Sequence, residues 1–294
     1  MSIHRTVLLK ETIDGLNLSP EAMVLDGTFG GGGHSAEILK RFPKAKIIAL
    51  DQDQNALIGN DNRISFYHEN FRNLDKVVAG KKVDAIIFDL GLSSDQLENS
   101  GRGFSFKQDE PLLMTLMENP GPEDTTAHDV VNHWDEKNLA DIIYGYGEER
   151  YSRKIAGAIV EAREKMEIKT TFDLVKIIGE AVPAAYKRGR LHFATRIFQA
   201  IRIAVNDELG ALQEGLEKGF DALKINGRMA VISFHSLEDR IVKNFYKEKT
   251  KEKKAILINK KPILANSEEL KDNPRARSAK LRILEKNETS SPTT

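Results

Sequence analysis

The chain has 294 residues, of which 40% are apolar and 30% charged, and its 44 basic residues balance 44 acidic ones. This composition predicts a folded chain with one or two cores and no strong overall electrostatic field. The absence of cysteine excludes disulfides, cysteine-ligated zinc, iron–sulfur clusters and thiolate nucleophiles. The apolar runs are too short to span a bilayer, and residues 1–11 do not read as a signal peptide, so we expect a cytoplasmic protein with no membrane partner.

Short strand-like runs alternate with helical stretches in the first third of the chain. Such alternation is typical of a parallel sheet covered by helices, and runs such as VDAIIFDL are apolar on both faces, as a covered sheet requires. A further strand is expected only after a long interval. The predicted strands are residues 22–26, 46–51, 64–68, 83–90 and 228–234, with a helix over 35–41.

Helical patterns fill the interval between the fourth and fifth predicted strands. Helices are expected over 138–146, 150–165 and 172–182. Thr170 and Asp173 stand in capping-box register for the last of these. An apolar stripe from Ile197 to Leu223 predicts one long helix, ended by Asn226-Gly227. We therefore expect an α/β domain of residues 1–104 and 205–294, interrupted by an all-helical insertion of residues 105–204.

The first predicted strand runs into a glycine-rich turn, and a helix follows. The strand ends at Asp26, and four consecutive glycines occupy 30–33. Glycines let a ligand approach the backbone, and a helix N-terminus offers free N–H groups. A second strand ends in Asp51, where a carboxylate can accept hydrogen bonds from both hydroxyls of a ribose. These features predict a site for a nucleoside cofactor.

Two cofactors are consistent with this turn. Gly31, Gly33 and Ala36 satisfy the G-x-G-x-x-G/A dinucleotide pattern, but the match begins several residues after the strand. Asp26 would place negative charge where the diphosphate of NAD must lie. S-adenosylmethionine (SAM) carries an ammonium and a sulfonium and no phosphate, so an acid favours it. SAM is therefore the expected cofactor, and a nicotinamide-dependent oxidoreductase is the alternative.

The composition also limits the acceptor of a transferred methyl group. Methylation of pyrimidine C5 usually needs a cysteine, and radical methylation of carbon needs an iron–sulfur cluster, so transfer to nitrogen or oxygen remains. The fourth predicted strand ends in Asp89, at the sheet edge where open α/β folds place their active sites. Asp89 could hold the cofactor or accept a hydrogen bond from an amine.

Several separated motifs make the chain resemble a known family over nearly its full length. They are HRTVLL at 4–9, DGTFGGGGHS at 26–35, DLGLSSDQ at 89–96, RGFSF at 102–106, YGEER at 146–150, ATRIFQAIRIAVNDEL at 194–209, SFHSLEDRIVK at 233–243 and NPRARSAKLR at 273–282. The chain resembles the RsmH (MraW) family of bacterial small-subunit rRNA cytosine N4-methyltransferases. This resemblance implies a class I SAM-dependent methyltransferase (Rossmann-like) domain with a helical insertion that recognises substrate.

The resemblance also implies an activity, a partner and a set of cofactor contacts. The activity is methyl transfer from SAM to N4 of a cytosine in the decoding region (P site) of 16S rRNA, within the small ribosomal subunit. Gly32 to His34 would meet the methionine portion, Asp51 the ribose and Phe71 the adenine. Asp89 and Gln96 would close the pocket. The implied cofactor contacts are Gly32, Gly33, His34, Asp51, Phe71, Asp89 and Gln96.

The chain departs from the family pattern at two places. It has PLLMTL at 111–116 where PLDMRM is usual, losing an acid and an arginine, and HFATR at 192–196 where HPATR is usual. A divergent paralogue that methylates another RNA or nucleobase amine therefore stays open. So does an RNA-binding module that retains SAM without catalysis.

Candidate substrate contacts lie at strand ends. Asp89, Ser93 and His235 are candidate catalytic residues; Ser233 is a further candidate contact, and Ser236, in capping-box register with Asp239, is expected to be a helix N-cap. The histidines show no metal-ligand spacing, so no metal is expected. A homodimer is possible. Basic residues expected to hold RNA phosphates lie in 240–261, in Lys187 to Arg190 before His192, and at Arg275, Arg277, Lys280 and Arg282.

Overall fold

The computed structural model describes residues 6–53 and 61–288. It divides into two compact units, one formed by 1–91 with 209–294 and the other by 92–208. The sequence places these boundaries near 104 and 204. The polar sequence NETSSPTT at 287–294 predicts a frayed C-terminus, and residues 289–294 of it lie outside the described residues. No helix in the described part of the chain has the length and apolar character needed to cross a membrane.

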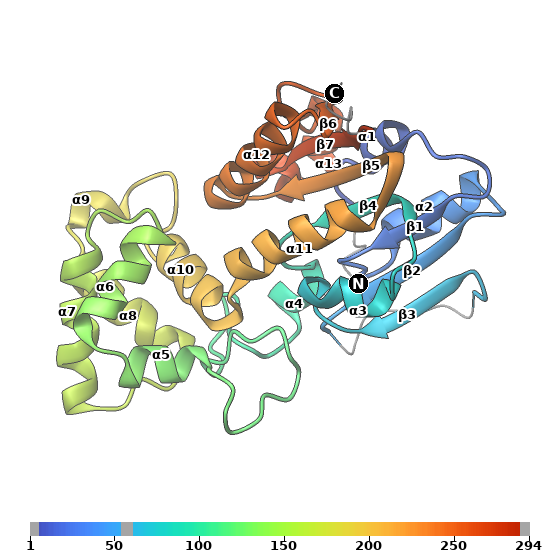
Figure 1. The fold of residues 1–294 in the computed structure, drawn as a ribbon. Coiled ribbons are helices and arrows are strands. Elements are labelled where there is room, and N and C mark those ends of the chain that lie inside the picture. The colour runs from blue at the N-terminus through green and yellow to red at the C-terminus, as the bar shows by residue number, and fades with distance from the viewer. Residues whose placement is uncertain (1–5, 54–60, 289–294) are drawn as a thin grey trace. The chain divides into compact units, whose positions relative to one another are not determined.

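The first unit is built on a seven-stranded sheet in the order β3-β2-β1-β4-β5-β7-β6 (Figure 1). Strands β1 to β5 run parallel, and β7 pairs antiparallel with both β5 and β6. The five strands expected from the sequence are confirmed, whereas β6 and β7 were not expected. The strands are β1 (Met23–Asp26), β2 (Lys46–Asp51), β3 (Ile64–His68), β4 (Val83–Asp89), β5 (Leu223–Ser233), β6 (Ala255–Leu257) and β7 (Lys280–Lys286).

Helices cover both faces of this sheet. Because strand side chains alternate between faces, Ala85 and Ile87 of β4 join one apolar cluster and Ile86 and Phe88 join the other. The first cluster includes α1 (Leu9–Leu16), α2 (Gly33–Arg41), α13 (Ser267–Asp272) and the 3₁₀ turn η2 (Pro274–Ser278). The second includes η1 (Phe71–Asn73), α3 (Leu74–Val78), α11 (Glu208–Ala222) and α12 (Ser236–Lys251). The observed fold of this unit is the α/β class expected from the sequence, with helices on both faces of a mainly parallel sheet.

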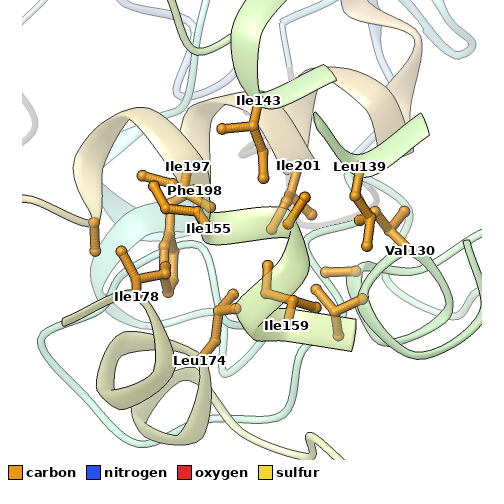
Figure 2. Packing of buried hydrophobic residues seen from close by; sticks show 14 of the residues in the cluster. Val130, Leu139, Ile143, Ile155, Ile159, Leu174, Ile178, Ile197, Phe198 and Ile201 are labelled. Atoms are coloured by element: carbon orange, nitrogen blue, oxygen red, sulfur yellow. The ribbon is translucent and has the colours of Figure 1, made fainter. Parts of the chain in front are cut away.

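The second unit is helical and has its own core. Figure 2 shows that residues from several helices, among them Ile155, Leu174 and Ile201, meet in one buried apolar cluster. The helices are α4 (Ser94–Glu98), α5 (Ala127–His133), α6 (Glu136–Gly145), α7 (Ser152–Lys165), α8 (Thr171–Ala181), α9 (Ala184–Lys187) and α10 (Thr195–Asn206).

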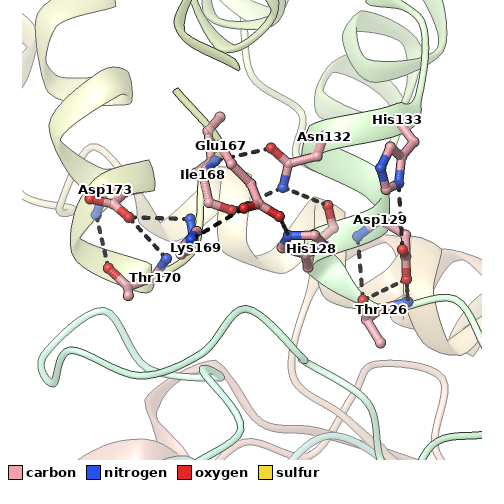
Figure 3. A network of polar contacts seen from close by, with 10 residues as sticks. All are labelled: Thr126, His128, Asp129, Asn132, His133, Glu167, Ile168, Lys169, Thr170 and Asp173. Atoms are coloured by element: carbon pink, nitrogen blue, oxygen red, sulfur yellow. Dashed lines mark hydrogen bonds and ion pairs between the residues drawn. The ribbon is translucent and has the colours of Figure 1, made fainter. Parts of the chain in front are cut away.

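Polar side chains fix the start of helices in this unit. The expected capping box of Thr170 and Asp173 is present at α8, and α5 begins with a box of the same kind. Asn132 near the end of α5 then binds Ile168, two residues before that cap. Its amide donates to the Ile168 carbonyl at 2.9 Å and accepts from the Ile168 N–H at 3.0 Å (Figure 3). These bonds fix the segment that leads into α8 against α5.

The prediction of one long helix from Ile197 to Leu223 is wrong. Asp207 adopts a left-handed conformation, with φ of 46°, and separates α10 from α11. The apolar steps of three and four continue on both sides of this break, so the pattern did not reveal it. Asn226-Gly227 does not end the helix either, because both residues lie inside β5. Asn226 has φ of 63° where the pairing of β5 with β4 shifts register.

Candidate functional site

The glycine turn after β1 needs glycine at particular positions. Gly32 is the N-cap of α2 and has φ of +69°, and Gly30 has φ of +50°. Such angles are costly for other residues. A Cβ at Gly33 would lie 1.8 Å from Oγ1 of Thr6, which belongs to the HRTVLL motif. The N-terminal motif and the glycine turn therefore pack against each other without room for a side chain.

Asp51, at the end of β2, holds the glycine turn. Its Oδ2 accepts a hydrogen bond from the Gly30 N–H at 2.7 Å, and its Oδ1 accepts from the Asp53 N–H at 2.8 Å. Burial raises the pKa of this carboxyl above its usual value. Each carboxylate oxygen can accept a second hydrogen bond. Asp51 can thus accept from a ligand while it shapes the turn.

Asp26, at the end of β1, is only 2% exposed and braces the turn from inside. Its Oδ2 accepts a hydrogen bond from Ser35 Oγ at 2.7 Å, and Oδ1 accepts from the Thr28 N–H at 3.3 Å. Burial raises the pKa of Asp26 to about 6, although both hydrogen bonds oppose the rise. Ser35 and Thr28 were not singled out in the sequence; the signal was their position on either side of the glycines.

Asp89, at the end of β4, is the acid with an unsatisfied oxygen. Its backbone N–H donates to Thr28 Oγ1 at 2.6 Å, and its Oδ2 lies 3.8 Å from Nδ1 of the buried His34. Its Oδ1 is buried and has no hydrogen-bond partner among the described residues. Burial, and then the neighbouring charges of Asp26 and Glu238, raise the pKa of Asp89 to about 8.

The three acids of the site, Asp26, Asp51 and Asp89, favour SAM over a dinucleotide as the bound cofactor. A buried acceptor without a donor is unfavourable by about 1–3 kcal/mol, and a cation beside Asp89 would remove that penalty. A diphosphate would instead meet repulsion from the ionised forms of Asp26, Asp51 and Asp89. The residues therefore fit a ligand with a positive charge and a ribose, as SAM has, and disfavour a dinucleotide.

Phe71 lies in η1, directly after β3, where it adjoins the glycine turn. Its ring centroid is 5.0 Å from that of Phe88. A Cβ at Gly27 would lie 3.2 Å from Phe71 Cβ, and one at Gly215 would lie 2.5 Å from its ring. Phe71 is partly buried, so it packs into the domain and keeps some exposed surface.

Two of the predicted site residues belong to the second unit and bind each other. The Ser93 N–H donates to Gln96 Oε1 at 2.9 Å, and the Gln96 N–H donates to Ser93 Oγ at 3.1 Å. This reciprocal pair starts α4 in the manner of a capping box. The other predicted residues, Gly32, Gly33, His34, Asp51, Phe71, Asp89 and His235, belong to the first unit.

The expected N-cap at Ser236 is wrong, because His235 takes that place. His235 Nδ1 accepts from the Glu238 N–H at 3.4 Å, and the Glu238 carboxylate accepts from the His235 N–H at 3.2 Å. His235 Nε2 lies 3.1 Å from the other Glu238 oxygen. Ser233 is also engaged, since its Oγ donates to the Lys280 carbonyl at 3.4 Å. Imidazole is an uncommon cap, so the sequence pattern pointed to the serine.

Three basic residues expected to hold RNA phosphates form ion pairs inside the first unit. Arg282, 8% exposed, donates to Asp239 Oδ1 at 2.7 Å, and Lys280 donates to Oδ2 of the same residue at 3.1 Å. Lys249, within the basic stretch 240–261, is 9% exposed and donates to Glu217 at 2.7 Å. These ion pairs indicate a structural role for Lys280, Arg282 and Lys249, and their expected role in phosphate binding stays a prediction.

Comparison with known proteins decides the family. The model of the MraW methylase family matches residues 1–287. The chain belongs to the MraW methylase family. A ribosomal RNA small subunit methyltransferase H from Limosilactobacillus fermentum is 43% identical, with 96% of this chain and 98% of that protein covered. Members of this family are SAM-dependent methyltransferases, so SAM is the cofactor of this chain.

Solved structures with a related fold have low sequence identity. An rRNA methylase from Streptococcus thermophilus is 14% identical with a TM-score of 0.42, covering 96% of this chain and 93% of that one. A Streptococcus mutans protein, described as a methyltransferase and solved with SAH, is 14% identical with a TM-score of 0.44, covering 96% and 99%. Both scores lie below 0.5, so the family assignment rests on the sequence matches.

Proposed function

We propose that this MraW family member transfers a methyl group from SAM to the exocyclic N4 of a cytosine in the decoding region (P site) of 16S rRNA, within the small ribosomal subunit. The observation that carries the proposal is 43% identity, over 96% of the chain, to a small subunit rRNA methyltransferase. The site supports it with a buried carboxyl group, Asp89, whose ionised form a positively charged ligand would stabilise.

The proposed cofactor contacts follow the geometry of the first unit. The backbone of Gly32 to His34 faces the methionine portion, Asp51 accepts from the ribose, and Phe71 packs on the adenine. Asp89 neutralises the positive charge of the donor. Gln96 belongs to the second unit, where its Oε1 accepts from Ser93, and it stays a predicted cofactor contact on the family resemblance alone.

The main contribution of the protein to this reaction is to align the methyl donor with the N4 atom of the cytosine. Bound SAM supplies a methyl group on a sulfonium sulfur, which keeps the electrons of the broken C–S bond while the N4 lone pair forms the new C–N bond. Alignment of the two reactants is worth up to roughly 7–11 kcal/mol. A carbonyl or carboxylate facing the amine localises the N4 lone pair, and water accepts the departing proton. Ser93 and His235 are the proposed contacts with the base.

The departure at 111–116 is accommodated inside the second unit. Met114 and Thr115 are buried, at 0% and 2% exposure. Asn206 donates to the Met114 carbonyl at 2.8 Å, and Arg102 donates to the Leu116 carbonyl at 2.8 Å. The segment is thus packed and hydrogen-bonded, so the departure from the family pattern is compatible with a folded second unit.

The test is analysis of 16S rRNA from a strain that lacks this gene. Small subunits from that strain are incubated with SAM and the purified protein, and the digested rRNA is examined by mass spectrometry. The proposal requires N4-methylcytidine at one decoding-region cytosine. A methyl group on another nucleoside would indicate a divergent paralogue, and no methylation despite SAM binding would indicate a non-catalytic module. Asp89→Asn is the matched loss-of-function variant.

A further inference from the structure

Three cations lie at and just after the end of α9 on the surface of the second unit. Lys187, Arg188 and Arg190 are exposed, and none of them pairs with a carboxylate among the described residues. We call residues 187–192 the basic turn. Three other exposed lysines of this unit are paired with carboxylates, for example Lys137 with Asp141 at 2.6 Å. Unpaired, clustered cations are available to an anionic partner without breaking an existing ion pair.

A buried acid holds the start of the basic turn. Glu149, with 0% exposure, accepts hydrogen bonds from the Tyr186 hydroxyl and, at 2.8 Å, from the Tyr151 N–H. The Arg150 guanidinium lies over the rings of Tyr151 and Tyr186, 4.9 and 5.4 Å from their centroids. Since Tyr186 precedes Lys187, these contacts fix the position from which the cations extend.

Stacked rings hold the other end of the turn. The His192 ring lies 4.4 Å from Phe106 at 13° and 4.2 Å from Phe193 at 30°. Phe193 packs on α8, where a Cβ at Gly179 would lie 3.3 Å from its ring. His192 Nδ1 accepts from the Ala194 N–H at 3.3 Å, so the proton of the neutral ring is on Nε2. His192 itself is exposed, and its edge can donate a hydrogen bond.

We propose that the basic turn binds single-stranded RNA, with Lys187, Arg188 and Arg190 on phosphates and the Nε2–H of His192 donating to an RNA oxygen or ring nitrogen. The inference rests on the proposed function, which supplies an RNA substrate. Leu191, 51% exposed between Arg190 and His192, offers an apolar side chain to an unstacked base. In a duplex the base faces are covered by neighbouring bases, so this feature favours single-stranded RNA.

The cations set the expected salt dependence. For single strands, each neutralised phosphate contributes about 0.7 to the slope of log affinity against log salt. Loss of three phosphate contacts should therefore lower the slope by about 2. Loss of a neutral hydrogen-bond donor should lower affinity without changing the slope.

The first test uses two triple variants with the same change in charge. One is Lys187→Ala/Arg188→Ala/Arg190→Ala. The control is Lys137→Ala/Lys165→Ala/Lys169→Ala, in which each lysine already pairs with a carboxylate of this unit. Binding of a fluorescein-labelled single-stranded RNA oligonucleotide is followed by anisotropy at several salt concentrations. The proposal requires the slope to fall in the first variant only; equal slopes in both would overturn it.

A second variant tests the ring edge. His192→Phe retains a stacked ring but removes the Nε2 donor, so we expect several-fold weaker binding of the single strand at an unchanged slope. Unchanged affinity would overturn the role of His192. Polyglutamate and unlabelled RNA are compared as competitors for the labelled RNA. If polyglutamate displaced the labelled RNA at the same concentration as unlabelled RNA, an acidic protein would be the better partner and the RNA proposal would fail. N4-methylcytidine formation is scored separately, so failure of the proposed function is distinguishable from failure of this inference.

Discussion

Nδ1 of His34 lies 3.8 Å from Oδ2 of Asp89, although the two side chains come from different parts of the sheet edge. His34 is in the first turn of α2, and Asp89 ends β4. Because β1 and β4 are paired and parallel, the glycine turn and the end of β4 meet at one edge. A ligand that binds the turn is therefore next to the unsatisfied oxygen of Asp89.

The raised pKa of Asp89 predicts a pH-dependent stability. Its carboxyl binds a proton more tightly when folded, with a pKa of about 8 against 3.8. Its contribution to stability is therefore present below pH of about 4 and is lost as pH rises to about 8. We expect Asp89→Asn to gain at least about 1 kcal/mol relative to wild type between those limits. Urea unfolding without SAM measures this. Asp84→Asn, at the other end of β4, is the control and should show no such gain.

Asp51→Ala should weaken SAM binding at least tenfold without unfolding the protein. The substitution removes the proposed ribose acceptor and leaves the N–H groups of Gly30 and Asp53 without their partner. Each lost bond costs about 1 kcal/mol, so a modest fall in Tm is expected. Calorimetry and thermal melting measure the two effects. Asp61→Ala removes a partly exposed acid that pairs with Arg63 and should leave SAM affinity unchanged. Equal affinity in both variants would contradict the role of Asp51.

Gly33→Ala should destabilise the chain through its contact with Thr6. The added Cβ would lie 1.8 Å from Thr6 Oγ1 but 3.1 Å from Thr6 Cβ. Removing the hydroxyl should therefore relieve most of the clash, and Gly33→Ala/Thr6→Ala should recover much of the lost stability. Denaturant midpoints of the two single variants and the double variant measure the coupling. Additive effects would show that the two residues are not in contact.

Arg282→Ala should affect stability and not RNA binding. The change leaves the partly buried Asp239 with Lys280 as its remaining cation, so a loss of about 1–3 kcal/mol is expected. Arg277→Ala, at an exposed position of η2, is the control for stability. If Arg282→Ala lowered the slope of log RNA affinity against log salt and left stability unchanged, Arg282 would instead be a phosphate-binding residue.

The sequence predicted the parallel strands because their apolar runs are continuous and end in acids. β2 and β3 begin and end where the pattern placed them. β7 was missed because Lys280, Arg282 and Glu285 give its sequence a charged appearance. Lys280 and Arg282 both pair with Asp239, and Glu285 pairs with Arg228 at 2.7 Å. Partners distant in sequence make this strand possible, and a local pattern does not contain them.

The acids and the glycine turn of the candidate site were predicted because they are visible in the local sequence, as the apolar strands are. The acids at strand ends and the glycine turn are local features, so Asp26, Asp51 and Asp89 could be identified. Their division of roles depends on burial and hydrogen bonds. Asp26 is satisfied by Ser35, whereas Asp89 retains an unsatisfied oxygen. Similarly, the cap at His235 depends on how β5 enters α12, which local sequence does not specify.

Proton release on SAM binding measures most directly whether Asp89 lies beside the positive charge of the cofactor. At a pH of about 7 the carboxyl of Asp89 is mostly protonated, because its pKa is about 8. A cation beside it would lower that pKa and release close to one proton, about 0.9 at most. Calorimetry in buffers of different ionisation enthalpy measures this number. We predict proton release and tight binding for wild type, and no release with at least tenfold weaker binding for Asp89→Asn. Equal affinity of the two proteins, or binding of NAD in preference to SAM, would contradict the account.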